Sequence, residues 1–98
     1  MFKLEQNNGQ INLLGQLDFN TVADLLKPGS VNLDFQQIDV DLSQVTRFNS
    51  ASLALLLEWL KLATQKGAQI KYHNAPEQLL AIARAYGIDQ ELPLGVSE

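Results

Sequence analysis

The sequence contains no cysteine, and His73 is its only histidine. Without cysteine the chain can form neither a disulfide framework nor a thiolate metal site. A single histidine with no second one nearby does not make a metal site, because such sites need several ligands close together. We therefore expect no metal and no cofactor, and the chain does not require an oxidising compartment.

Basic clusters and long apolar runs are also missing. The seven Lys and Arg residues are scattered, and eleven Asp and Glu residues give a net charge of -4. A nucleic-acid partner would require a basic patch. The longest apolar run, Leu53–Leu57, is far shorter than the roughly 20 residues that span a bilayer, and the first ten residues do not resemble a signal peptide. We expect a cytoplasmic protein with no nucleic-acid partner and no direct membrane insertion.

The familiar catalytic strings are absent as well. No GxxxxGK[ST], GxGxxG, GxSxG or HExxH pattern occurs, so the usual signals for nucleotide binding, acyl transfer and zinc hydrolysis are missing. We expect a protein that is not an enzyme.

Hydrophobic periodicity and turn residues predict the order of the elements. Asn7-Asn8-Gly9 is a strong turn signal between two alternating segments, and the segment 31–35 alternates too, as either a strand or an extended connection. We expect strands near 2–6, 10–15, 38–42 and 69–73, and helices near 19–27 and 50–66, with a third helix framed by Pro76 in its first turn and Gly87 past its last turn. This order, ββαβαβα, predicts an α/β fold in which a sheet with parallel pairs carries packed helices. We expect one domain over residues 1–98, with a frayed tail at about 93–98.

The helix expected from Ser50 carries apolar residues on two opposite faces. Helical steps of about 100° per residue place Leu53, Leu56, Leu57 and Leu60 on one side, which we expect to face the sheet. A second stripe points the other way and consists of Ala51, Leu55, Leu62 and, beside them, Trp59. Either a neighbouring helix covers this second stripe, or the stripe is a partner-binding surface with an aromatic anchor.

Serines open this helix, and two interpretations of them are compatible. Asn49 or Ser50 is expected to be the N-cap that accepts a hydrogen bond from a free amide. Ser50 is also a candidate phosphorylation site, because the positive end of the helix would stabilise a phosphate. Asp39 and Asp41 leave the same face of their strand, and we interpret them as a solvated pair rather than a catalytic one.

Three motifs, in order and at suitable spacing, resemble the signatures of the STAS domain, the sulfate-transporter and anti-sigma-factor-antagonist family. They are G-Q-L-D at 15–18, D-L-S at 41–43 and N-S-A-S-L-A-L-L-L at 49–57. The resemblance implies a mixed β-sheet flanked by helices. Within the family, S-L-A-L-L-L-E-W-L-K-L-A from Ser52, A-R-A-Y-G-I-D at 83–89 and L-P at 92–93 are similar to the MlaB group, the cytoplasmic STAS subunits of the Mla phospholipid-transport ABC complex of Gram-negative bacteria.

That resemblance implies a function without catalysis. MlaB-type subunits bind the MlaF-type ATPase and, through it, the permease and the periplasmic lipid-binding subunits, at the inner membrane. The complex moves phospholipid between the two membranes and maintains outer-membrane lipid asymmetry. On this basis the partner-binding residues would be Ser50, Ala51, Ser52, Leu55, Trp59 and Leu62.

The motif residues also carry over from the family, with departures. Ser50 falls where antagonists have their phosphorylatable residue, and Asp18 and Asp41 match the acidic positions of the first two motifs. Asn49 replaces the usual Asp, which removes part of the charge contrast that a phosphate switch exploits. The departures therefore favour permanent docking over a switch.

Two alternatives remain open at this point. One is an anti-sigma-factor antagonist that phosphorylation at Ser50 would switch. The other is a sensor that binds a small ligand or nucleotide in a groove near Asp18 and Ser50.

Overall fold

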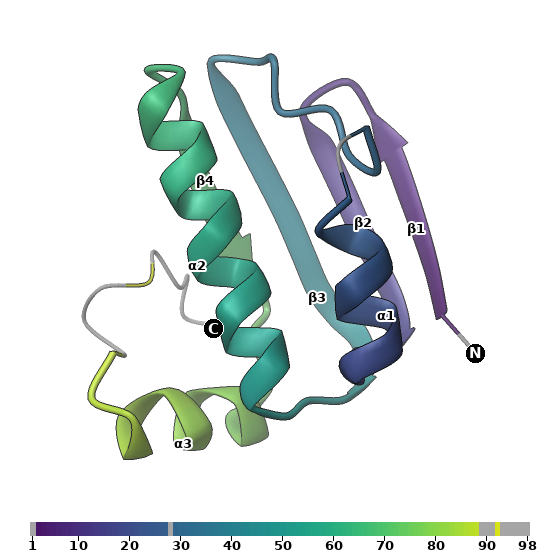
Figure 1. Cartoon of the computed structure of the whole chain (residues 1–98), viewed down its shortest axis with the longest axis vertical. Coiled ribbons are helices and arrows are strands. Elements are labelled where there is room, and N and C mark those ends of the chain that lie inside the picture. Colours follow the sequence, from purple (N-terminus) through teal and green to yellow (C-terminus); the bar gives the residue numbers. More distant parts are fainter. Residues whose placement is uncertain (1, 28, 89–91, 93–98) are drawn as a thin grey trace.

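A computed structural model describes residues 2–27, 29–88 and 92 of the chain (Figure 1). Its four-stranded sheet has the order β1-β2-β3-β4, and the order of elements along the chain is the predicted ββαβαβα. The strands are β1 (Phe2–Asn7), β2 (Gln10–Gln16), β3 (Gln37–Arg47) and β4 (Gln69–His73); the helices are α1 (Phe19–Leu25), α2 (Ser50–Gln65) and α3 (Glu77–Ala85).

The first two strands form the predicted hairpin. They pair antiparallel, with Asn7 opposite Gln10, and Asn8 takes a positive φ of 55° in the turn. Gly9 lies against the start of β3: its carbonyl oxygen accepts a 2.8 Å hydrogen bond from the N–H of Asp39, and a Cβ added at Gly9 would collide with the carbonyl oxygen of Gln37. The glycine therefore permits this close approach of two backbones.

The remaining strands are parallel, and this determines where the helices lie. β2 pairs with β3 and β3 with β4 in parallel, so each pair needs a crossover connection, which α1 and α2 supply. Both crossovers step in the same direction along the sheet. Because such crossovers are right-handed, they place both helices on the same face, as Figure 1 shows.

The other face of the sheet is not covered by any helix in the described part of the chain, and we call it the open sheet face. The strands alternate accordingly: Ile38, Val40 and Leu42 of β3 are buried beneath the helices, while the residues between them are half-buried. The open sheet face presents mainly polar side chains from all four strands, including Lys3, Glu5, Asn12, Asp39, Asp41, Lys71 and His73.

Segment 31–35 is not a strand, so the extended connection is the interpretation that the structure supports. Leu33 is nonetheless buried. The side chain of Gln6 holds this segment to β1, donating to the carbonyl oxygen of Asn32 (2.6 Å) and accepting from its N–H (3.0 Å). β3 continues to Arg47, beyond the predicted end, because Val45 provides another buried contact after a shift in register against β2.

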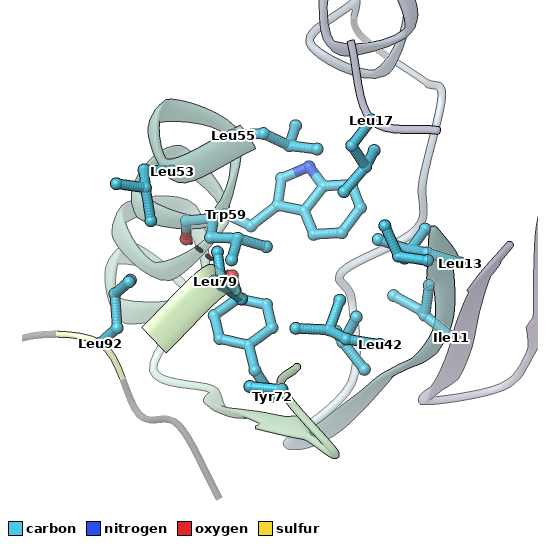
Figure 2. Close-up of a cluster of buried hydrophobic side chains, with 14 of the residues drawn as sticks. Ile11, Leu13, Leu17, Leu42, Leu53, Leu55, Trp59, Tyr72, Leu79 and Leu92 are labelled. Carbon is cyan, nitrogen blue, oxygen red and sulfur yellow. Dashed lines mark hydrogen bonds between the residues drawn. The ribbon is translucent and has the colours of Figure 1, made fainter. Parts of the chain in front are cut away.

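The core fills the space between the sheet and the helices (Figure 2). Trp59 of α2 and Tyr72 of β4 are its largest fully buried side chains. The hydroxyl of Tyr72 donates to the carbonyl oxygen of Leu56 at 2.7 Å, which satisfies the phenol and fastens β4 to α2. Leu79 and Ala83 of α3 close the core from below.

Some predictions fall on residues outside the described part of the chain. These are the frayed tail at 93–98, Pro28 in the predicted stop after α1, and Asp89 and Pro93 in the C-terminal similarity. Within the described residues, no helix combines the length and the apolar character that crossing a membrane requires.

Candidate functional site

The N-termini of α1 and α2 lie at the same end of the sheet (Figure 1). Both helices follow neighbouring parallel strands, whose carboxyl ends meet at one edge. The N–H of Leu17 donates to the carbonyl oxygen of Arg47 at 3.0 Å, and the hydroxyl of Ser52 donates to the carbonyl oxygen of Leu17 at 2.8 Å. The two helix starts are thus tied together through the residues that precede α1.

Asp18 caps α1, as the sequence predicts. Its Oδ1 accepts hydrogen bonds from the backbone N–H and from the hydroxyl of Thr21, both at 3.0 Å. The backbone bond from Thr21, with the hydroxyl bond second, lowers the pKa of the Asp18 carboxyl from its ordinary value of 3.8. The acidic residue of the first motif therefore has a structural role at this site.

Asn49 is the N-cap of α2. Its side-chain oxygen accepts from the N–H of Ala51 (2.9 Å) and of Ser52 (3.3 Å), and the Ser52 hydroxyl accepts from the N–H of Asn49 at 3.0 Å. This reciprocal pair is a capping box. Ser52 is fully buried, so the prediction that its side chain faces a partner is wrong.

The second apolar stripe of α2 does not face outwards. The exposed fraction of Leu55 is 0% and that of Trp59 is 1%, so the predicted outward orientation of these two residues is wrong. The alternative interpretation is confirmed: α1 packs against α2, and Figure 2 shows Leu55 and Trp59 pointing towards Leu17, just before α1. Ala51 and Leu62 are half-buried. On the opposite side, Leu53 and Leu56 are buried as predicted, while Leu57 and Leu60 are only half-buried.

A groove between α2 and the end of α3 begins at Ser50 instead. It has a volume of about 290 Å³ and is lined by Ser50, Leu53, Ala54, Leu57, Tyr86 and Ile88. We call these six residues the α2–α3 groove. Ser50 and Ala54 are exposed, and Tyr86, the C-cap of α3, is 62% exposed. Phe19, the first residue of α1, is 67% exposed at the same end of the molecule.

Sequence reasoning missed this groove for two reasons. Tyr86 follows the apolar face of α3 in helical spacing, and this predicts a buried side chain, but its side chain is largely exposed at the C-cap of the helix. Ser50 and Ala54 lie four positions apart beside Leu53 and Leu57 of the first stripe, and this spacing is the one weak signal that pointed to the groove.

Asp41 does not join this site. It lies six residues before the end of β3, and its side chain leaves the sheet on the face opposite α2. The carboxylate accepts from the N–H and hydroxyl of Ser43 (3.1 and 2.9 Å) and from the side chain of Asn74 (3.0 Å). Partial burial raises the pKa of Asp41, but the hydrogen bonds from Asn74 and Ser43 outweigh it, so that the pKa lies below 3.8.

His73 and Asp39 form the neighbouring contact on the open sheet face. The Nε2 atom of His73 lies 2.7 Å from Oδ1 of Asp39. Within the described residues, no three His, Cys, Asp or Glu side chains come together in a group that could hold a metal ion. The contact between His73 and Asp39 links β4 to β3 on the open sheet face.

Comparison with known proteins identifies the class to which this fold belongs. The structure of the anti-sigma factor antagonist SpoIIAA in its unphosphorylated form matches 100% of this chain and 89% of its own, with a TM-score of 0.76 and 13% sequence identity. The crystal structure of Mglu matches 80% of this chain with a TM-score of 0.59 and 17% identity, but this covers only 20% of that longer chain. At these identities the likeness shows a shared fold, that of the STAS domain.

The family follows from the sequence itself. Residues 1–95 match the family described as MlaB, STAS domain, and the chain belongs to this family. No curated protein matches the sequence. STAS domains are generally non-catalytic binding domains that mediate protein–protein interactions, so the fold and the family together suggest a regulatory or binding role.

Proposed function

We propose that this protein is a non-catalytic regulatory and assembly subunit that binds the cytoplasmic ATPase of an Mla-type ABC transporter. Through the ATPase it associates with the permease and the periplasmic lipid-binding subunit, at the cytoplasmic side of the inner membrane. The assembled transporter moves phospholipids between the inner and outer membranes and maintains outer-membrane lipid asymmetry.

One observation carries this proposal: an MlaB-type chain presents an exposed, mainly apolar groove that begins at the motif residue Ser50. Exposed apolar patches with an aromatic residue at the rim are typical of protein interfaces. Tyr86 and Phe19 provide large exposed apolar side chains here. The described residues that line the groove include no charged side chain, so apolar contact would supply most of the affinity.

The proposed docking surface replaces the one that the sequence predicted. Ser50 remains at one end of the proposed surface. Ala51, next to Ser50, and Leu62, about three turns further along α2, are half-buried. Leu55, Trp59 and Ser52 support the surface from within the core and do not contact the partner. Binding favours the assembled state of the ATPase through a shift in population, because the subunit stabilises the conformation to which it binds.

Co-purification with an Mla-type ATPase from the same organism tests the proposal. Ser50→Arg and Ala54→Arg place a long charged side chain in the α2–α3 groove, and we expect each to weaken the complex at least about tenfold. Ala81→Arg makes the same change at an exposed alanine in the middle of α3 and should leave the complex intact. If both groove variants bind as well as the wild type, the proposed surface is wrong.

The anti-sigma-factor antagonist is the second candidate, and one observation favours it. Ser50 is exposed at the start of a 16-residue helix, where a kinase could reach its hydroxyl and the helix dipole would stabilise a phosphate. The antagonist function predicts that the protein in cells carries the added mass of one phosphate, and that this added mass is lost when Ser50 is replaced. If the protein is unmodified under all growth conditions and Ala54→Arg abolishes ATPase binding, the antagonist function is contradicted and the transporter-subunit function is supported.

A further inference from the structure

We infer that β1 is a second interaction surface, through which two copies of this chain pair edge to edge. β1 is the edge of the sheet, and in Figure 1 no described element lies beyond it. An edge strand presents backbone N–H and C=O groups without partners and is a template for pairing with another strand. The inference does not rest on the proposed function, because β1 contributes no residue to the α2–α3 groove.

The hairpin determines which backbone groups point to this free edge. Its two-residue turn pairs Asn7 with Gln10, and hydrogen-bonded and non-hydrogen-bonded pairs alternate from there along an antiparallel ladder. A tight hairpin begins with a hydrogen-bonded pair at its turn, so the backbone groups of Phe2, Leu4 and Gln6 point outwards. Leu4, in the middle, can exchange two backbone hydrogen bonds with Leu4 of a second copy.

The charges of β1 fit a second β1 strand in this one register. Lys3 and Glu5 are two residues apart on the open sheet face and form an ion pair within the chain at 3.2 Å. With Leu4 opposite Leu4, Lys3 of each copy lies opposite Glu5 of the other, giving two cross-strand pairs of opposite charge. A shift of the pair by two residues in either direction places Lys3 opposite Lys3 or Glu5 opposite Glu5, and a shift by one places side chains on the wrong face.

The apolar side chains of β1 agree with this arrangement. Phe2 and Leu4 face the helices and are only partly buried, although they pack against the core. In the paired sheet the two Leu4 side chains meet across the two-fold axis, which extends the core from one copy to the next. Five residue pairs make a contact smaller than the roughly 800 Å² per partner of a stable interface, so the dimer is weak and depends on protein concentration.

Sedimentation equilibrium of the full chain over an about hundredfold concentration range tests the inference. We expect the wild type to self-associate reversibly, and Lys3→Glu and Glu5→Lys each to weaken this about tenfold, because each replaces two attractive cross-strand pairs by two repulsive ones. A mixture of Lys3→Glu and Glu5→Lys chains should associate again as a mixed dimer, and so should the double variant with itself.

Both side chains are exposed, so the variants should fold, which circular dichroism verifies. Lys71→Glu is the matched control, since it reverses an exposed charge on β4, the opposite edge strand, and should leave self-association unchanged. A wild type that stays monomeric throughout, or a dimer that persists in both single variants, would overturn the inference. Neither result would affect binding of the ATPase to the α2–α3 groove.

Discussion

Two serines at the start of α2 have opposite surroundings although only one residue separates them. Ser50 is exposed, whereas Ser52 is fully buried and takes part in two hydrogen bonds, to the carbonyl oxygen of Leu17 and from the N–H of Asn49. The second serine therefore holds the helix start in place, and the first is available at the surface. A hydroxyl in the STAS motif can thus be structural or functional according to its position.

Ser52→Ala should lower the free energy of unfolding by about 1–3 kcal/mol, because it leaves a buried carbonyl oxygen and a backbone N–H without their partner. Ser50→Ala, the matched control, should change it by less than about 0.5 kcal/mol, since the side chain is exposed. Urea unfolding at neutral pH measures both values. Equal effects of the two substitutions would contradict the different roles assigned to them.

Asp18 predicts a dependence of stability on pH. Its folded-state pKa lies below the ordinary value of 3.8, so the ionised cap contributes stability that is complete above the unfolded-state pKa and is lost as the pH falls through the folded-state pKa. We expect the wild type to lose stability relative to Asp18→Asn between about pH 5 and pH 2, because asparagine also caps but does not titrate. Urea unfolding of both proteins across this range measures the difference. A constant difference would show that the Asp18 carboxyl has the same pKa in the folded and the unfolded protein, so that its hydrogen bonds do not lower it.

At the scale of the element, α2 is covered on two sides. Its buried residues come from both stripes and form one broad face towards the sheet, beside which α1 packs. The exposed strip of α2 with Ser50 and Ala54, together with Leu53 and Leu57 of the first stripe, borders the α2–α3 groove. A substitution on α2 therefore tests either stability or docking, depending on which strip it falls on.

Leu55→Ala should cost about 2–5 kcal/mol in the free energy of unfolding, because it leaves a cavity in a fully buried position. Leu26→Ala is the matched control: Leu26 is 46% exposed at the end of α1, and its truncation should cost under about 1 kcal/mol. Thermal or urea unfolding compares the two. A small effect of Leu55→Ala would mean that the stripe is not covered by α1.

The same reasoning affects binding experiments on this helix. A charged side chain at position 55 would be buried without a partner, and this would destabilise the fold rather than act specifically on the interface. Loss of the ATPase complex with Leu55→Asp would therefore say nothing about docking, and the exposed Ala54 is the better position.

At the scale of the whole molecule, the sequence predicts the features that depend on neighbouring residues, such as turns and helix caps. It does not predict the features that depend on contacts between residues distant in the sequence. Asn8-Gly9 marks a turn, Asp18 caps a helix, and Gly67, with a positive φ of 74°, follows the end of α2. These local signals give the element order and most boundaries. Which stripe of α2 is solvent-exposed depends on where α1 lies, and periodicity within one helix cannot show this. Asp41 and Ser50 are both motif residues, but the side chain of Asp41 leaves β3 on the face of the sheet opposite α2.

The candidate site was predictable in part for the same reason. Ser50, Asn49 and Asp18 meet at one end of the molecule because two parallel strands end there, as the expected topology implies. Tyr86, the C-cap of α3, joins the groove because α3 lies beside the start of α2, and this contact between distant residues does not follow from the local sequence.

The open sheet face offers a practical advantage for labelling. It lies on the other side of the sheet from the α2–α3 groove, and Lys71 projects from it on β4, far along the sheet from β1. Because the chain has no cysteine, Lys71→Cys would create a single reactive thiol for a fluorophore. Such a dye could report on tumbling and proximity while both proposed contact surfaces stay unmodified.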